Sequence, residues 1–375
     1  MTDARYWVGF SRIPQIGPIK VRRLLDHFGD LAAAWDASAL ELAAAGLDRR
    51  GLESILAVRP QIDLAAEMDK IARAGARVLV WDDPDFPRLL RDIPAPPFAL
   101  YVKGEIKPED EWSIAVVGTR HASAYGREVT RQLVGDLVRN HITIVSGLAR
   151  GIDAEAHRAA LDAKGRTIAV LGTGVDVTYP PEHLKLAQQI VEQGALVSEY
   201  PLGTQPEAGN FPPRNRIISG LSLGSLIVEG DEESGARITI EDAVEQNRET
   251  FAVPGNIFHR ESRGPNGMIQ RGEAKLVTRA ADILEELNLT MVEQQIQVRT
   301  AIPENDIEAT LLKQLSADPL HIDEIGRSSG LPISAVSSTL AMMELKGMVK
   351  QVGGMNYVVA RERGIAYDTQ SIDKA

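Results

Sequence analysis

Two glycine-rich segments each follow an apolar run and each contain an arginine. The first is Gly118-Thr119-Arg120, directly after Ile114–Val117, and the second is Ser146-Gly147-Leu148-Ala149-Arg150-Gly151. Backbone N–H groups at a helix start attract anions, and an arginine beside them offers a fork of donors that matches phosphate oxygens. One such turn alone is also ordinary strand-to-helix geometry, but two with paired arginines favour a phosphate site.

A third segment carries a different set of polar side chains. Phe211-Pro212-Pro213-Arg214-Asn215-Arg216 places two arginines and an asparagine at a predicted helix start, behind an aromatic residue and two stiff prolines. Charge, amide hydrogen bonding and a stacking ring are the means by which proteins bind single-stranded nucleic acid. The alternative puts Phe211 in the core and pairs the arginines with Glu199 or Glu229. Beside Arg120 and Arg150 we prefer the binding hypothesis.

The elements that must position these residues form an alternating pattern from residue 112 to residue 287. Apolar strands alternate with amphipathic helices, which predicts an α/β fold with an extended Rossmann-like, doubly wound parallel sheet. In such a sheet ligands bind at the carboxyl ends of the strands, so the two arginine turns should share one crevice. We expect strands at Ile114–Val117, Thr143–Ser146, Thr167–Leu171, Leu196–Ser198, Ser225–Val228 and Thr250–Val253. We expect helices at Tyr125–Val138, Ala154–Leu161, His183–Glu192, Arg214–Leu221, Thr239–Gln246 and Asn266–Arg271.

Smaller segments flank the sheet domain on both sides. Residues 1–60 read as a small helical domain, in which Ile13–Lys20 resembles either a helix-hairpin-helix turn that approaches a DNA phosphate or a plain connector in a bundle. Residues 61–111 are predicted to be a connector with one strand at Arg77–Trp81. Residues 288–303 read as a linker, 304–360 as three helices and a β-hairpin, and 361–375 as a tail.

Three helices and a hairpin make a winged helix, yet this one lacks a basic surface. Residues 304–360 contain seven acidic and four basic residues, a net charge of −3. The helix expected to enter the major groove is rich in serine and alanine and carries no arginine. Duplex binding needs positive charge, so we favour a protein-contact module over a DNA reader.

Composition narrows the function classes further. The chain has no cysteine and a formal net charge of −11, so any nucleic-acid site must be a local basic groove. No apolar run reaches transmembrane length and Met1–Arg5 lacks a signal-peptide pattern, so we expect a cytoplasmic protein without membrane contact. We expect no metal and no cofactor, because neither metal-ligand spacing nor a Walker lysine is present. Asp153 and His157 share a helix face, but a capping aspartate and an orienting histidine are favoured over an acid–base pair.

The motifs together, in this order, closely resemble the DprA/Smf family of DNA-processing proteins. The resemblance spans the sheet domain and rests on Gly118–Arg120, Ser146–Asp153, Ala156-His157, Thr167–Gly174, Tyr179-Pro180, Ser198–Pro201, Phe211-Pro212, Arg214–Leu221 and Phe251–Gly255. It implies a non-enzymatic homodimer that binds single-stranded DNA entering during natural transformation, protects it, and loads a RecA-type recombinase. It also implies that Arg120 holds phosphate and that Phe211, Arg214, Asn215 and Arg216 form the other wall of the groove.

The sequence departs from the family pattern at two informative places. Pro181 stands where many relatives have a lysine after the Tyr-Pro pair, and Lys185, one helical turn on, is the candidate replacement. Arg237 lies in a segment, Ser234–Ile240, that differs from the common motif. It is either an added basic contact or a residue locked in an ion pair with Asp231-Glu232-Glu233.

The expected single-stranded DNA site therefore has thirteen members and no catalytic residue. They are Gly118, Thr119, Arg120, Ser146, Gly147, Arg150, Gly151, Lys185, Phe211, Arg214, Asn215, Arg216 and Arg237. The expected dimer surface is Met268, Ile269 and Leu276. A competing hypothesis is an enzyme that acts on nucleotides or their N-glycosidic bonds with strand-end carboxylates such as Glu199 and Glu229, and a third is a transcription regulator that works through the winged helix.

Overall fold

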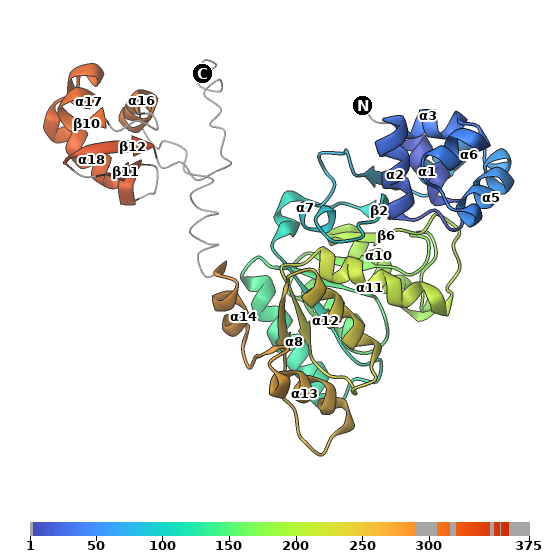
Figure 1. The fold of residues 1–375 in the computed structure, drawn as a ribbon. Coiled ribbons are helices and arrows are strands. Elements are labelled where there is room, and N and C mark those ends of the chain that lie inside the picture. The colour runs from blue at the N-terminus through green and yellow to red at the C-terminus, as the bar shows by residue number, and fades with distance from the viewer. Residues whose placement is uncertain (1–2, 290–305, 316–319, 346–348, 353, 360–375) are drawn as a thin grey trace. The chain divides into compact units, whose positions relative to one another are not determined.

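The protein consists of two compact units, residues 1–287 and 288–375, in the computed structural model. The structure describes residues 3–289, 306–315, 320–345, 349–352 and 354–359. Most of the predicted linker and all of the predicted tail lie outside the described residues. Figure 1 shows the first unit as a bundle of helices beside a larger sheet domain.

Short capped helices form the N-terminal part of the first unit. They are α1 Ala4–Ser11, α2 Pro18–Phe28, α3 Leu31–Asp36, α4 Ala39–Ala44, α5 Arg49–Val58 and α6 Leu64–Arg73. Aspartate or serine side chains accept hydrogen bonds from the first turns of α1, α3, α4, α5 and α6, which satisfies backbone donors that a helix start leaves free. The bundle buries Trp7 and Phe10 in one core with Val80 and Tyr101, so it packs on the edge of the sheet.

The sheet has nine strands in the order β1-β2-β6-β5-β4-β3-β7-β8-β9. The strands from β6 to β9 in this order are parallel, whereas β1 and β2 add an antiparallel edge. Their bounds are β1 Ala76–Val80, β2 Ala99–Gly104, β3 Ser113–Val117, β4 Thr143–Ser146, β5 Thr167–Val170, β6 Ala195–Ser198, β7 Gly224–Ile227, β8 Glu249–Ala252 and β9 Lys275–Leu276. All six expected strands are present, each shifted by no more than one residue at either end.

The range 61–111 differs from the expected connector. It contains β1, β2 and the short helix α7 Arg88–Arg91, and β2 pairs with β6, so this segment completes the sheet. Sequence reasoning found β1 and missed β2, although β2 pairs with β1 as well as with β6, because the preceding prolines suggested an extended link.

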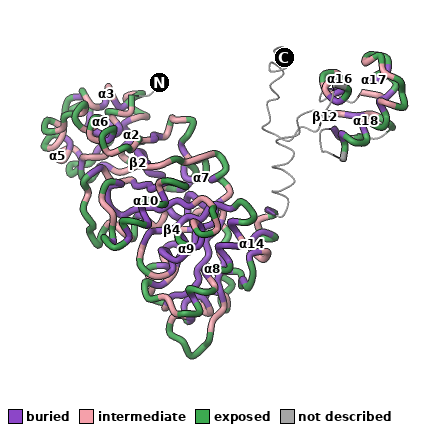
Figure 2. Tube along the Cα trace, turned by 180° about the vertical axis from the view of Figure 1, so that it is seen from behind, coloured by how far each residue is buried: buried purple, intermediate pink, exposed green. Residues whose placement is uncertain are grey.

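Helices cover both faces of the sheet (Figure 1). They are α8 Ala124–Arg139, α9 Ile152–Asp162, α10 Leu184–Gln193, α11 Phe211–Gly220, α12 Gly235–Glu245, α13 Arg263–Arg271 and α14 Ala280–Glu286. On one face α9 packs between α8 and α10, and on the other α11 packs on α12. Short 3-10 helices lie at Arg59–Gln61, Pro108–Glu111, Pro181–His183, Ala208–Asn210 and Arg260–Ser262. Figure 2 shows the buried stretches running between these layers.

The second unit is a winged helix, as expected. Helices α16 Asp306–Gln314, α17 Ile322–Ser329 and α18 Ile333–Leu345 accompany strands β10 Leu320–His321, β11 Val349–Gln351 and β12 Asn356–Val359 in the order β10-β12-β11. Its core contains Leu311, Ile325, Val336, Leu340 and Met343. Val336, Leu340 and Met343 recur at helical spacing, which is why α18 was predictable from the sequence.

The expected dimer surface needs a correction. Met268 is only 2% exposed and packs in the core of the sheet domain, so its assignment to a free surface is wrong. Ile269 is half-buried against the same core, and Leu276 is exposed on the edge strand β9. Within the described residues, no helix is both long and apolar enough to cross a membrane.

Candidate functional site

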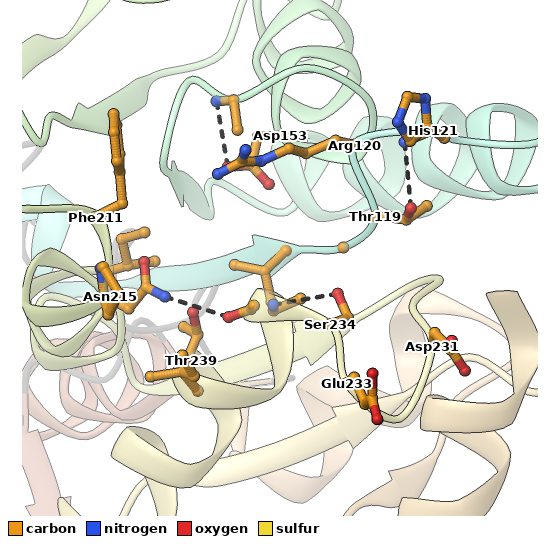
Figure 3. Close-up of a pocket in the computed structure, with 18 of the residues that line it drawn as sticks. Thr119, Arg120, His121, Asp153, Phe211, Asn215, Asp231, Glu233, Ser234 and Thr239 are labelled. Atoms are coloured by element: carbon orange, nitrogen blue, oxygen red, sulfur yellow. Dashed lines mark hydrogen bonds between the residues drawn. The ribbon is translucent and has the colours of Figure 1, made fainter. Parts of the chain in front are cut away.

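A crevice of about 480 Å³ opens where the strand order of the sheet reverses. Strands β3 and β7 are neighbours, and the chain continues from β3 towards β4 on one side and from β7 towards β8 on the other. The loops after β3 and β7 therefore diverge, and ligands bind in such openings. Figure 3 shows Arg120 and Asp153 on one wall, Phe211 at one end, and Asp231 and Glu233 at the other.

Backbone hydrogen bonds tie the loops that frame the crevice. Thr119 N donates to Glu229 O at 2.7 Å, and Ile152 N donates to Thr119 O at 3.1 Å. Gly151 has a φ of 78°, and a Cβ at that position would lie 2.1 Å from Thr119 O. Only glycine allows this approach, so Gly151 shapes the site by bringing the β4 and β3 loops together.

Arg214 forms the floor of the crevice and is buried. Its Nη1 donates to Gly147 O at 2.8 Å and also to Val170 O, so one guanidinium joins the carboxyl ends of β4 and β5 to α11. The guanidinium occupies the space that a side chain at position 147 would fill. Burial lowers the pKa of Arg214 to about 10, and the nearby Asp153 carboxylate opposes that shift.

Asp153 lies beside this arginine in the first turn of α9. Its carboxylate accepts hydrogen bonds from Gly147 N at 3.1 Å and Ala149 N at 3.4 Å, so it holds the loop that precedes the helix. Burial raises the pKa of Asp153, and the positive charges of Arg214 and Arg120 oppose that rise. Asp153 therefore has a structural role, but the expected capping role is wrong, because Gly151 is the N-cap residue of α9 and no side chain caps this helix start.

Arg120 is an exposed cation of the crevice. It follows β3 and its side chain extends over the opening towards Asp153 (Figure 3). No carboxylate in the described part of the chain forms an ion pair with it, so its guanidinium donors remain available to a ligand. This arrangement suits a phosphate group.

Phe211 was expected either in the core or exposed as a stacking ring, and its observed position lies between the two. Its side chain is half-buried, lines the crevice and packs on Tyr179 with a ring-centroid distance of 5.5 Å. The ring is therefore neither in the core nor fully free, and its remaining surface faces the opening. Asn215 lines the same wall, where its Nδ2 donates to Gly235 O at 3.3 Å.

The other expected arginines are engaged elsewhere. Arg150 pairs with Glu182 at 2.6 Å, Arg216 with Glu199 at 2.6 Å, and Arg237 with Glu241 at 2.8 Å. Arg237 is thus locked in a local ion pair, although not with the three acids that were expected. Of the thirteen expected residues, the crevice brings together Gly118, Thr119, Arg120, Phe211, Arg214 and Asn215.

The remaining expected residues have other positions. The Ser146 hydroxyl is buried and donates to Val116 O at 2.7 Å, so its expected contact with DNA is wrong. Gly147 and Gly151 act through the backbone contacts described above. Lys185 is exposed in the first turn of α10, outside the crevice.

Glu199 and Glu229, the carboxylates on which the enzyme hypothesis depends, both bind other groups of the protein. Glu229 is buried and accepts from the Ser123 backbone N at 2.9 Å and hydroxyl at 2.5 Å, which caps α8. Burial raises the pKa of Glu199, and its salt bridge to Arg216 opposes the rise. His157 bonds Thr167 Oγ1 at 2.7 Å and does not pair with Asp153. No cluster of possible metal ligands occurs among the described residues.

Sequence reasoning missed one wall of the crevice. Asp231, Glu233, Ser234, Thr239 and Arg260 line it together with the residues named above. Asp231 and Arg260 form an ion pair at 2.5 Å. The position of Asp231 just after β7 was the available signal, because β7 neighbours β3 in the reversed strand order.

Replacing Arg214 by methionine should lower the free energy of unfolding by about 3 kcal/mol, because it removes the link between β4 and β5 and leaves the buried Asp153 charge with less compensation. Arg237→Met, which removes an exposed ion pair, should change it by about 0.5 kcal/mol or less. Denaturant unfolding of both variants measures the difference. A loss of DNA affinity with unchanged stability in Arg214→Met would show that this arginine is a ligand contact instead.

Comparison with known families agrees with this geometry. The sequence matches the family described as DNA recombination-mediator protein A over residues 77–288 and the DprA winged helix domain over residues 297–355. Protein Smf of Escherichia coli is 37% identical, with 94% of this chain and 95% of the relative covered.

Two solved structures are similar as well. DNA processing protein A of Streptococcus pneumoniae is 34% identical with a TM-score of 0.68, over 76% of this chain and 99% of that chain. DNA processing protein A of Helicobacter pylori, studied for its single-stranded DNA binding mode, is 29% identical with a TM-score of 0.52, over 57% and 95% of the two chains. The chain therefore belongs to the DNA recombination-mediator protein A family, also called DprA/Smf.

Proposed function

We propose that this protein binds single-stranded DNA in the crevice between β3 and β7 and acts as a recombination mediator without catalysis of its own. The observation that carries the proposal is the pairing of Arg120, which is exposed and free of carboxylate partners among the described residues, with Phe211 in one opening. A phosphate can lie against the guanidinium while an unpaired base stacks on the ring.

The similarity to a DNA processing protein with a reported single-stranded DNA binding mode supports the same function. The proposal includes protection of the strand during natural transformation and its transfer to a RecA-type recombinase, which is the role that the family resemblance implies. The structural engagement of Glu199 and Glu229 argues against the competing nucleotide-cleaving enzyme, since neither carboxylate is free to face a substrate.

Replacing Arg120 by alanine should weaken binding to single-stranded DNA by about 1.5–3 kcal/mol, because one charge-assisted phosphate contact is lost. The fold should persist, since Arg120 is exposed. Fluorescence anisotropy with a labelled oligonucleotide measures the affinity, and thermal unfolding measures the stability. Arg139→Ala, at the far end of α8, is the matched control. Equal affinities for the wild type and a folded Arg120→Ala variant would refute the proposed phosphate site.

Removing residues 304–375 should leave the affinity for single-stranded DNA nearly unchanged, because the winged helix is acidic whereas the crevice lies wholly in the first unit. The slope of log affinity against log salt should also persist, since each lost phosphate contact lowers it by roughly 0.7 for single strands. Titrations at several salt concentrations test both quantities. A marked fall in either one would assign DNA contacts to the winged helix.

A further inference from the structure

The loop between β8 and α13 exposes large apolar side chains beside basic ones. Phe258 is 86% exposed and Ile257 is 74% exposed, and His259, Arg260 and Arg263 follow within five residues. Exposed apolar patches on a folded protein commonly mark interaction sites. Aromatic and basic residues interleaved in this way are typical of surfaces that bind single-stranded nucleic acid.

A hollow separates this loop from the start of α8. It is lined by Ser123, Tyr125, Asn256, His259 and Ser262, among others, and Tyr125 is 48% exposed. The Tyr125 hydroxyl donates to Pro254 O at 2.7 Å, which fixes the ring beside the loop. The hollow therefore combines an aromatic ring with amide, imidazole and hydroxyl groups, which can contact a nucleobase on its face and its edges.

Two segments of the chain contribute residues to both the crevice and the hollow. The segment after β3 contributes Arg120 and His121 to the crevice and Ser123 to Tyr125 to the hollow, and the loop after β8 contributes Arg260 to the crevice and His259 to the hollow. The loop is anchored at this junction, because Gly230 N donates to Glu261 O at 2.6 Å. A DNA strand that leaves the crevice over Arg120 and His121 would next meet Tyr125 and the loop that carries Phe258.

Exposed arginines beside this route can attract a polyanion. Arg127 and Arg263 are exposed, and no carboxylate within the described residues forms an ion pair with either. Three acids lie beside this route. Asp231 pairs with Arg260 at 2.5 Å, Glu229 is buried in the wall of the hollow and accepts from the Ser123 hydroxyl, and Glu261 lines the crevice. Glu233 lies near Asp231, at the end of the crevice opposite Phe211 (Figure 3).

We propose that the hollow and Phe258 form a second base-stacking station for the same DNA strand, a conclusion that rests on the proposed function of the crevice. A protein partner fits less well, because the apolar part consists of two neighbouring side chains flanked by Asn256 and His259. A stable protein interface buries about 800 Å² on each partner, whereas a single nucleobase needs only one exposed ring face.

The inference is tested on the full chain with thymidine oligonucleotides of about 4 to about 16 nucleotides. Phe258→Ala should weaken binding of the longest oligonucleotide about 5-fold or more, while the shortest, held in the crevice, binds as it does to the wild type. Phe258→Trp should restore the affinity, and its added fluorescence should be quenched by the long oligonucleotide. Leu40→Ala, an exposed apolar residue of the N-terminal bundle, is the control.

Unchanged affinity of Phe258→Ala at every length, with no quenching in Phe258→Trp, would overturn the second station. If Arg120→Ala still weakens binding in that case, the proposed function of the crevice stands. Loss of a dimer in Phe258→Ala by light scattering, with DNA affinity per protomer intact, would also overturn the inference, because Phe258 would then contact a second copy.

Discussion

The buried guanidinium of Arg214 is the interaction on which the crevice depends. It reaches from α11 to the carbonyl groups of Gly147 and Val170, so it fixes the ends of two parallel strands relative to the helix that carries Phe211 and Asn215. A buried charge is costly unless polar groups satisfy it. Here two carbonyls accept its hydrogen bonds and Asp153 supplies the opposing charge. Asp153 in turn holds the loop that leads into α9, so floor and walls form one connected network.

This network leaves Arg120 in a different situation from three other arginines that were expected to bind DNA. Arg150, Arg216 and Arg237 each have a carboxylate within 3 Å. A ligand phosphate would have to displace those partners, which offsets much of the gain from a new contact. Arg120 needs no such exchange. A chain with a net charge of −11 can therefore still present a local positive site, because Arg120 lines the crevice and forms no ion pair within the described residues.

The sequence predicted the architecture well and the roles of the arginines less well. Strand and helix alternation located every parallel strand from β3 to β8, because each carries a local apolar pattern. It missed β2, which lies between β1 and the distant β6 and follows prolines that suggested an extended link. The burial of Arg214 did have a sequence signal. It lies three, four and seven residues before Ile217, Ile218 and Leu221, all buried, and this spacing puts it on the inner face of α11. The sequence left pairing of the α11 arginines with Glu199 open as the alternative, and the tertiary contact of Arg216 with Glu199 decides for it at that residue.

The most direct test of the central claim is the affinity of the full chain for oligonucleotides of increasing length, measured at several salt concentrations. A crevice that binds a DNA strand predicts affinity that rises with length, falls with salt and exceeds the affinity for duplex of the same length. Binding of a mononucleotide as tightly as of a long strand, with little dependence on salt, would contradict the account and favour a nucleotide-binding enzyme.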